Sequence, residues 1–362
     1  MTEWKTYKLS EITIMRNGKK RPQNKGAYPV YGGNGIMDYA DSFNAENTIV
    51  LGRVGAYCGN VYQCKGKCWV SDNAISVSAN ELVDSNYLYY LMSSLDFHHH
   101  HIGGAQPLMT QDIIGGFEIS LPSLEERRRI AGILGAIDDK IECNRRINAN
   151  LESQAQTLFD NLILDTNLKY SPISEIEHII ETGRRPKGGV ANITAGVPSI
   201  GAENIKGLGK YDYSKTKYIT ADFAGTMKKG IIKGYELLIY KDGGKPGYFI
   251  PNFSIFGEGF PYDDMTLNEH VFLLDFGNKG YNFFAYFYMQ TEEVMKYLNA
   301  QGSKAAIPGI NRNDVENISI PRIENEKVKK FCAVVEPIIT SILINSKESS
   351  RLAPFEILYY LN

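Results

Sequence analysis

The sequence of 362 residues has few cysteines and no long uninterrupted apolar run. Among its five cysteines, Cys58, Cys64 and Cys68 are separated by five and three residues and lack the paired spacing of a zinc site. We therefore expect free thiols and no metal. The longest apolar stretch, 331–344, is interrupted by Glu336 and Pro337 and is shorter than the ~20 residues that span a bilayer. Because the N-terminus also lacks the pattern of a secretory signal, we expect a cytoplasmic protein without membrane contact.

The sequence also lacks an excess of positive charge. Lys and Arg number 39 and Asp and Glu 41, which gives a net charge of −2, while charged residues make up 22% and apolar residues 43%. This composition is that of an ordinary globular protein and excludes a disordered chain or a uniformly basic surface. If nucleic acid is the partner, the positive charge must gather in patches. At roughly 100–200 residues per domain, the length predicts two or three domains.

What the sequence does contain is an internal repeat. Short motifs recur in the same order in both halves: 9–12 with 173–176, 18–22 with 183–186, and 119–122 with 318–321. The offset between matching motifs grows from about 164 to 199 residues along the chain. We therefore expect two copies of one domain, with a net insertion of about 35 residues in the second copy, for which the Lys-rich stretch 207–234 is the candidate.

Each copy ends in a segment with the pattern of a long helix. Residues 125–161 contain no proline, and Ser123 stands three residues before Glu126, as in a capping box. In each segment the apolar residues form one narrow seam: Ile130, Leu134, Ile137, Ile141, Leu151, Ala155, Leu158 and Leu162 in the first, and Phe331, Val335, Ile338, Ile342 and Leu352 in the second. A helix with a single seam buries it best against a similar helix, so we predict an antiparallel pair.

Polar residues interrupt both seams near their centres. Asn144 and Asn148 lie on the first seam and Asn345 on the second. We expect these residues to fix the register of the helix pair; the alternative is an exposed surface where the helices splay apart. Pro337 predicts a bend in the second helix, because a proline inside a helix removes a backbone hydrogen bond.

Outside these helices, short β-rich runs alternate with glycines, which is typical of an α+β domain. The expected strands lie at 48–51, 74–77, 236–240 and 270–274, and the expected helices at 87–95 and 282–298. The predicted fold is α+β, with two repeated globular domains separated by a long antiparallel two-helix coiled coil in a pseudo-twofold arrangement. Its parts are a first domain (1–122), a first spacer helix (123–165), a second domain (166–321) and a second spacer helix (322–362).

The segment that joins the first domain to its helix resembles a known family. It reads Leu-Pro-Ser-Leu-Glu-Glu-Arg-Arg-Arg-Ile-Ala-Gly-Ile-Leu over 121–134, and it follows a first domain that opens with a Leu-x-Glu-Ile motif. Together with the tandem repeat, it is similar to the specificity subunits of type I restriction-modification systems across essentially the whole chain. Glu125-Glu126 stands where the family usually has Glu-Gln, and the corresponding string at 320–326 is looser.

The resemblance implies that the two globular domains are target recognition domains, which read the halves of a bipartite asymmetric DNA site. It also implies that modification subunits with S-adenosylmethionine methylate adenine N6 and that restriction subunits with ATP and Mg cleave the DNA. The chain itself is then non-catalytic and has no cofactor of its own. The sequence agrees: it contains no Asn/Asp-Pro-Pro-Tyr/Phe motif, no glycine-rich turn suited to S-adenosylmethionine and no phosphate-binding Gly-x-x-x-x-Gly-Lys-Ser/Thr loop.

Basic residues recur at matching places in the two copies and are the candidate DNA contacts. The matching loops contain Lys19, Lys20, Arg21, Arg184, Arg185 and Lys187. Such loops suit phosphate contacts, although a solvated charged turn has the same composition. Arg53 and Lys241 each follow an expected strand and precede glycines, so they either reach a base edge or belong to a tight hairpin with an incidental charge. Further candidates are Asn34, Gln106, Gln111, Lys245, Lys304 and Arg312.

Two other groups of residues suggest different chemistry. The run His98–His101 is expected to be an exposed polar segment, since four consecutive histidines do not converge on one metal ion. Asp263 and Asp264, with Glu269 nearby, are more typical of a solvated acidic turn than of a cation site. Two other functions stay open: an assembly module that does not read bases, and an enzyme with an unrecognised site around Asp263, Asp264, Glu269 and His270.

Overall fold

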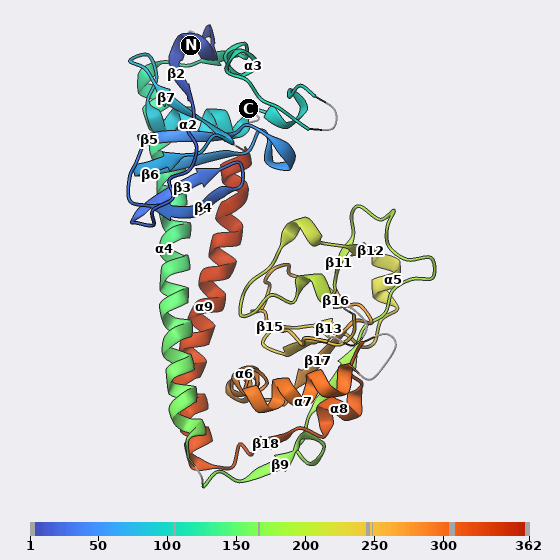
Figure 1. Ribbon diagram of the computed structural model, residues 1–362. Coiled ribbons are helices and arrows are strands. Elements are labelled where there is room, and N and C mark those ends of the chain that lie inside the picture. The colour runs from blue at the N-terminus through green and yellow to red at the C-terminus, as the bar shows by residue number, and fades with distance from the viewer. Residues whose placement is uncertain are drawn as a thin grey trace. The chain divides into compact units, whose positions relative to one another are not determined.

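The computed structural model describes residues 4–103, 106–165, 167–243, 247, 249–303 and 308–358. The chain divides into two compact units (Figure 1). Unit 1 comprises Met1–Lys140 with Leu352–Asn362, and unit 2 comprises Ile141–Arg351. Each unit has its own sheet structure and its own hydrophobic core, as two copies of one domain require.

Unit 1 is built on a six-stranded sheet with the order β2-β7-β5-β6-β3-β4, in which only β3 and β6 are parallel neighbours. Its strands are β2 (Thr13–Asn17), β3 (Tyr28–Gly32), β4 (Gly35–Ala40), β5 (Ala45–Gly52), β6 (Val61–Val70) and β7 (Ala74–Ala79). The predicted strands at 48–51 and 74–77 fall inside β5 and β7. Helix α2 (Ser85–Ser94) buries Leu88 and Met92 against Leu51 and Ile75 of these strands.

Shorter elements complete unit 1. β1 (Lys5–Lys8) pairs antiparallel with β8 (Glu118–Leu121), apart from the main sheet. The remaining elements are α1 (Leu9–Ile12), η1 (Gly55–Tyr57), η2 (Phe97–His99) and α3 (Gln111–Gly115).

Unit 2 contains two four-stranded sheets, ordered β10-β17-β14-β15 and β12-β11-β16-β13. In unit 1, the ten-residue strand β6 pairs with both β5 and β3 and so makes one continuous sheet. In unit 2, this strand is replaced by two short ones, β15 (Phe253–Ile255) beside β14 (Leu237–Tyr240) and β16 (Met265–Leu267) beside β11 (Val197–Ile200). The sheet is divided because residues 256–264 separate β15 from β16.

The other strands of unit 2 are β10 (Ile179–Thr182), β12 (Tyr218–Ile219), β13 (Ile231–Ile232) and β17 (Val271–Asp275), with β9 (Tyr170–Pro172) and β18 (Ser319–Pro321) as a separate antiparallel pair. Its short helices are η3 (Ile173–Glu175), η4 (Ala202–Asn204), η5 (Tyr213–Lys215), α5 (Ala221–Gly225) and α8 (Arg312–Glu316). The expected insertion at 207–234 contains η5, β12, α5 and β13.

The helix expected at 282–298 is instead two helices, α6 (Lys279–Tyr288) and α7 (Glu292–Gly302). The prediction of a single helix is wrong because Thr291, at the position before α7, has an extended backbone with φ −62° and ψ 149°, and its Oγ1 donates back to Tyr288 O at 2.8 Å. Threonine favours this position over a helix interior.

In each unit, one backbone hydrogen bond joins the start of the domain to its end. The residue offset between these two bonds differs from the offset between the matching sequence motifs. Leu9 N donates to Phe117 O, and Ile173 N donates to Ile318 O, both at 2.9 Å. The accepting carbonyls are 201 residues apart, whereas the motifs at 119–122 and 318–321 are 199 residues apart. The motif alignment is therefore wrong by two residues relative to the hydrogen-bond pattern. A shift of two leaves each side chain on the same face of its strand, because side chains alternate between the faces with a period of two.

The repeated glycines of the two basic loops are explained by close backbone approaches. A Cβ atom on Gly18 would lie 1.9 Å from Ser71 O, and one on Gly183 would lie 1.6 Å from Leu267 O. Since both obstacles are backbone atoms, only glycine fits at either position. The same local packing thus occurs at the start of the basic loop in both units.

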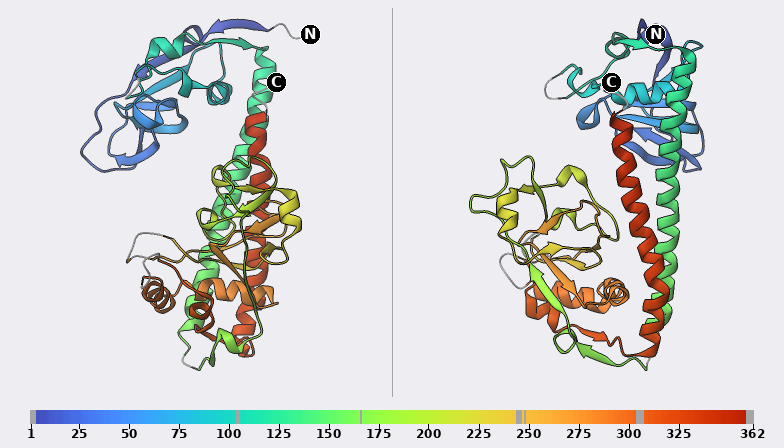
Figure 2. Two further views of the ribbon diagram at one scale, coloured as in Figure 1. Left: turned by 90° about the vertical axis from the view of Figure 1, so that its right-hand side faces the viewer. Right: turned by 180° about the vertical axis from the view of Figure 1, so that it is seen from behind.

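The two long helices are α4 (Leu124–Ile163) and α9 (Glu326–Leu358), visible from two further directions in Figure 2. Ser123 Oγ accepts a hydrogen bond from Glu126 N at 3.3 Å, as the capping pattern predicts. Within unit 2 the helices run antiparallel, because Asn144 of α4 contacts Ser349 whereas Phe159 contacts Phe331. α9 is continuous through Pro337, so the proline at which we expected a bend does not interrupt the helix.

The polar seam residues join the two helices directly. Asn144 is fully buried, and its Nδ2 donates to Ser349 Oγ at 3.2 Å and to Glu348 Oε2 at 2.8 Å. Asn345 Nδ2 donates to Asn148 Oδ1 at 2.9 Å. Adding 201 to 144 gives 345, and subtracting 201 from 349 gives 148. The two contacts are therefore related by the same offset as the accepting carbonyls of Phe117 and Ile318.

Phe159→Ala is expected to lower the free energy of unfolding by about 3–5 kcal/mol, as the loss of a buried aromatic ring does. The Phe159 side chain is 2% exposed, and its ring centroid lies 5.7–5.9 Å from those of Phe284, Phe287 and Phe331. Denaturant titration measures the change. Leu158→Ala, at a neighbouring position with 39% exposure, is the control and should cost much less. Equal losses in the two variants would contradict this packing.

The cysteines only partly follow the expectation of free thiols. Cys58, Cys143 and Cys332 are free, but Cys64 and Cys68 form a disulfide within β6. The prediction fails for this pair because the residues between them bring their Cα atoms to 6.6 Å, within the reach of a disulfide. No helix in the part of the chain that the structure describes has the length and apolar character that membrane crossing requires.

Candidate nucleic-acid interface

Three loops of unit 1 meet around Arg53, directly after β5. Arg53 N donates to Asn73 O at 2.9 Å, and Arg53 O accepts a hydrogen bond from Met109 N at 2.8 Å. Gly55 N donates to Pro107 O at 3.0 Å. These backbone bonds fix the path of the Arg53 loop, so the direction in which its side chain leaves the sheet is set by the fold.

The Arg53 side chain has an unused hydrogen-bond donor. Its Nε is buried and has no hydrogen-bond partner among the described residues. A buried donor without an acceptor costs about 1–3 kcal/mol, so this guanidinium favours the arrival of an acceptor. Guanine O6 and N7 and phosphate oxygens are acceptors of this kind. Gly33, which precedes the candidate Asn34, adjoins the same cluster, since a Cβ on Gly33 would lie 3.7 Å from Asn73 O.

A basic hollow of about 570 Å³ lies beside the Arg53 cluster. Its lining includes Lys20, Arg21, Lys25, Asp38 and Asn73, and the last of these also belongs to the Arg53 cluster. Asp38 bonds to Lys25 and lies 3.4 Å from Arg21 Nη1. The hydrogen bond from Lys25 lowers the pKa of Asp38, so this carboxylate stays ionised and offsets only part of the positive charge.

The same backbone pattern holds Lys241 in unit 2. Lys241 N donates to His270 O at 3.0 Å, and Lys241 O accepts from Ile310 N at 2.8 Å. Gly243 N donates to Pro308 O at 2.9 Å. These three bonds correspond one by one to those in unit 1. The two cations that the sequence analysis matched therefore occupy equivalent positions in the fold.

The side chains around this position differ between the units. Lys241 Nζ donates to Glu269 O at 3.2 Å and lies 3.8 Å from Asp242 Oδ2. Arg185 Nε donates to Glu269 Oε1 at 2.7 Å, and Arg185 Nη2 lies 2.7 Å from His270 Nε2. Carboxylates and a histidine thus surround the cations of unit 2, whereas a positive hollow adjoins those of unit 1.

The remaining candidate residues are exposed or are engaged in local contacts. Lys19, Asn34, Gln106 and Lys187 are exposed. Arg184 Nη2 donates to Thr226 Oγ1 at 2.7 Å, and Arg312 Nε donates to Glu316 Oε1 at 2.8 Å on its own helix. Lys245 and Lys304 lie outside the described residues.

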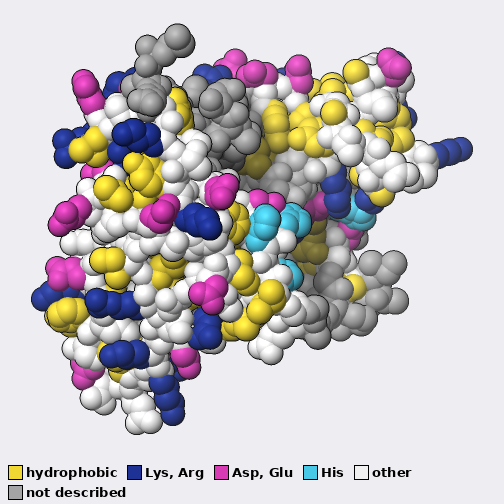
Figure 3. All heavy atoms as spheres, turned by 90° about the horizontal axis from the view of Figure 1, so that it is seen from above, with side chains coloured by type: hydrophobic (Ala, Val, Ile, Leu, Met, Phe, Trp, Pro, Cys, Tyr) yellow, Lys and Arg dark blue, Asp and Glu magenta, His cyan; other side chains and the backbone are white. Residues whose placement is uncertain are grey.

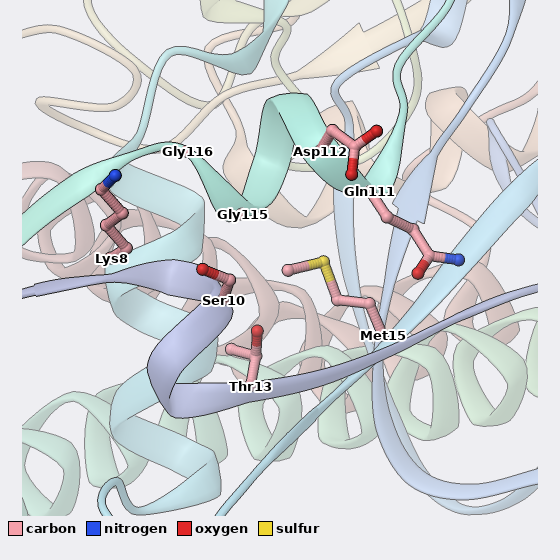
Figure 4. A pocket seen from close by; sticks show the side chains of 8 residues that line it. All are labelled: Lys8, Ser10, Thr13, Met15, Gln111, Asp112, Gly115 and Gly116. Atoms are coloured by element: carbon pink, nitrogen blue, oxygen red, sulfur yellow. The ribbon is translucent and has the colours of Figure 1, made fainter.

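A second hollow of unit 1, of about 420 Å³, lies where β1, α1, β2 and α3 meet (Figure 4). It contains Gln111, whose Nε2 donates to Asn17 Oδ1 at 3.1 Å. Lys8 and Asp112 also line it, from different elements. None of the residues that line this hollow takes part in the backbone hydrogen bonds around Arg53, and of the candidate DNA contacts it includes Gln111.

The groups that suggested metal or acid chemistry are distributed over the surface. His99 pairs with Asp96 at 2.5 Å, and the His100 ring packs against the Phe117 ring at 4.8 Å. The acidic pair 263–264 is exposed. Among the described residues, no three His, Cys, Asp or Glu side chains are placed to hold a metal ion. On the face drawn in Figure 3, Lys and Arg are interspersed with Asp and Glu, in keeping with the net charge of −2.

Sequence reasoning missed two members of these clusters and misassigned two others. Asn73 and Asp242 were not among the candidates, while Glu269 and His270 were considered only for an acidic turn, a cation site or an enzyme site and not for DNA contact. Positions 73 and 270 are equivalent because their carbonyls accept the hydrogen bonds from Arg53 N and Lys241 N. This equivalence would have identified the missed residues, but it depends on the pairing of the strands, which the sequence does not show.

The architecture and the repeated cationic loops agree with a known class of DNA specificity domain. Residues 1–153 match the family model described as "Type I restriction modification DNA specificity domain". This part of the chain is therefore similar to that family, as the motif at 121–134 also indicates.

Similar proteins carry the same description. Over 146 residues the chain is 30% identical to the type I restriction enzyme EcoprrI specificity subunit of Escherichia coli, a match that covers 38% of this chain and 36% of that protein. Over 290 residues it is 23% identical to the MjaIX specificity subunit of Methanocaldococcus jannaschii, covering 74% of this chain and 65% of the relative. The match thus spans little more than a third of the E. coli relative.

A solved structure extends the likeness of the fold to the whole chain. The type I restriction-modification S subunit from M. genitalium aligns with a TM-score of 0.67 and 15% sequence identity over 99% of this chain and 95% of that one. At this identity the likeness concerns the fold alone.

Proposed function

We propose that this chain is the sequence-specific DNA-binding subunit of a type I restriction-modification complex. It reads a bipartite asymmetric site, one half with each unit, and directs adenine N6 methylation and cleavage by partner subunits. The observation that carries this proposal is the single backbone pattern that holds Arg53 in unit 1 and Lys241 in unit 2. The same backbone pattern with different side chains suits the recognition of two different half-sites, because base edges are distinguished by their hydrogen-bond donors and acceptors.

The same proposal assigns roles to the parts of the chain. Residues 1–122 and 166–321 are target recognition domains, and 123–165 and 322–362 are spacer helices of a pseudo-twofold coiled coil. Asn144, Asn148 and Asn345 fix the register of this pair. Their support is that the contacts between α4 and α9 are related by the same 201-residue offset as Met109 and Ile310, the residues that donate to Arg53 O and Lys241 O.

In this proposal the chemistry belongs to the partners. Modification subunits supply S-adenosylmethionine and restriction subunits supply ATP hydrolysis with Mg, while this chain binds duplex DNA and is not an enzyme by itself. The names of the relatives, which are specificity subunits of restriction enzymes, support this division. The enzyme alternative would need Glu269 and His270, but these side chains are paired with Arg185 and Asp242.

Changing Lys19, Lys20 and Arg21 together to Ala is expected to weaken the binding of cognate and random duplexes about equally. Phosphate contacts carry no sequence information, and each one lost should reduce the slope of log K against log salt by about 0.9. The measurement is a titration of the assembled complex with both duplexes at several salt concentrations. Arg53→Ala, by contrast, should reduce the discrimination between the duplexes by about 1–3 kcal/mol, because it removes a base contact.

The matched control changes Lys296, Lys329 and Lys330 to Ala, which removes three exposed cations from α7 and α9. Its salt slope should equal that of the unmodified complex. An unchanged slope and affinity in the loop variant would remove the basic loop from the interface. Equal binding of every duplex by the unmodified complex would instead indicate an assembly module.

A further inference from the structure

Glu269 lies on the tight connection between β16 and β17, next to the Lys241 loop. Asn268, which precedes it, is 2% exposed, and its backbone N donates to Ile200 O at 3.0 Å. Asn268 Oδ1 accepts from His270 N at 2.8 Å. The backbone on both sides of Glu269 is thus held by hydrogen bonds, so the position of its carboxylate is set by the fold.

The two carboxylate oxygens of Glu269 have different surroundings. Oε1 accepts hydrogen bonds from both Nε and Nη2 of Arg185. Oε2 is buried and has no hydrogen-bond partner among the described residues. A buried acceptor without a donor is rare in folded proteins and calls for an explanation. An incoming hydrogen-bond donor provides one.

Arg185 is itself held in place on its other side. Its Nη2 lies 2.7 Å from His270 Nε2, and because arginine can only donate, His270 Nε2 is the acceptor. With Nε2 as the acceptor, the ring proton lies on Nδ1, which donates to Asp242 Oδ1. Asp242, His270, Arg185 and Glu269 form one connected chain of hydrogen bonds that fixes the orientation of the free oxygen.

The charges around this network allow a carboxylate to face DNA. Phosphates repel an isolated Glu, but Arg185 and Lys241 lie beside Glu269 and compensate its charge. Burial raises the pKa of Glu269 and is the largest single effect, but the hydrogen bond from Arg185, a backbone hydrogen bond and the charge of Arg185 together outweigh it, and the pKa is lowered. The carboxylate is therefore ionised at neutral pH and acts only as an acceptor.

The donors that a carboxylate meets on base edges in the major groove are the amino groups of cytosine N4 and adenine N6. Adenine also presents N7, an acceptor that repels a carboxylate, directly beside its amino group. Cytosine has no such neighbour, and its partner guanine presents acceptors suited to a nearby arginine. We propose that Glu269 Oε2 specifies a cytosine in the half-site read by unit 2, by accepting a hydrogen bond from its N4 amino group. This inference rests on the proposed function and names one base pair that unit 2 selects.

The test compares the motif methylated by complexes that contain the unmodified chain or Glu269→Gln. A glutamine amide can accept from cytosine N4 or, when turned, donate to thymine O4. The variant should therefore lose discrimination between C·G and T·A at one position of one half-site, by about tenfold or more. The other half-site should be unchanged, and its retention reports that the variant is folded and assembled. Glu292→Gln on α7, where the side chain is exposed and pairs with Lys296, is the matched control.

A second measurement changes the DNA instead of the protein. Replacing the selected cytosine with pyrimidin-2-one, which lacks the amino group, should weaken binding by the unmodified complex about tenfold relative to the same replacement in the gap between the half-sites. With Glu269→Ala the two replacements should have equal effects. This comparison remains valid even if the variant is less stable, because each complex is judged by the ratio of its affinities for the two modified duplexes.

Several outcomes separate this inference from the function on which it rests. A unit 2 half-site without any C·G pair, or an unchanged motif with Glu269→Gln, would overturn the role of Glu269 and leave sequence reading by the chain intact. Indifference of the unmodified complex to DNA sequence would overturn both.

Discussion

Replacing residues 1–122 with the corresponding segment of a related subunit is expected to change one half of the methylated motif and leave the other half intact. Arg53, its loop partners and the basic hollow all lie within this segment, and Lys241, Arg185 and Glu269 all lie outside it. Each set is held by hydrogen bonds within its own unit, so exchange of one set leaves the other undisturbed. Sequencing of methylated adenines in a host that carries the chimera measures the result.

The reciprocal exchange of 166–321 is the control for this experiment. It should change the other half of the motif and retain the half that the first exchange altered. If either chimera changes both halves together, the two units do not read independently, and the assignment of one half-site to each unit is wrong.

Lengthening the helix pair is expected to widen the unread gap of the recognition site. The insertion places four helix-forming residues after Asn148 in α4 and four before Ile342 in α9, which lie opposite each other because Asn148 Nδ2 donates to Ile342 O at 3.1 Å. At 1.5 Å per residue, each insertion adds about 6 Å. This length corresponds to about one or two base pairs, since ten base pairs span ~34 Å. Both half-site sequences should persist while the gap between them lengthens.

Insertion into α4 alone is the control. It moves Phe159 out of register with Phe331 while the contacts of Asn144 remain, so it should lower stability and methylation. Methylation of the original motif at full efficiency by the double insertion would show that the helices do not set the gap.

The long helices and the repeat were accessible from the sequence because both depend on local patterns. The heptad seam predicts α4 and α9, and Ser123 with Glu126 marks the start of the first. The equivalence of Arg53 and Lys241 was predicted because each residue follows an expected strand and precedes glycines. Such features need no knowledge of what packs against them.

The features that escaped prediction depend on partners far apart in the chain. Arg185 and Glu269 are 84 residues apart, and nothing near either residue indicates that they pair. The two-residue error in the motif alignment has another cause. A shift of two residues preserves the pattern of inward-facing and outward-facing side chains in a strand. Only the hydrogen-bond register therefore distinguishes an offset of 199 residues from one of 201.

The constant offset has a consequence for how such a chain can evolve. Between the loop that ends at Met109 or Ile310 and the helix residue Asn144 or Asn345, both copies have the same number of residues. Before that point they differ by many insertions and by the division of a sheet. Mutation and recombination can therefore remodel the upstream loops, which carry the DNA contacts in the proposed function, while the segment from loop to helix keeps its length.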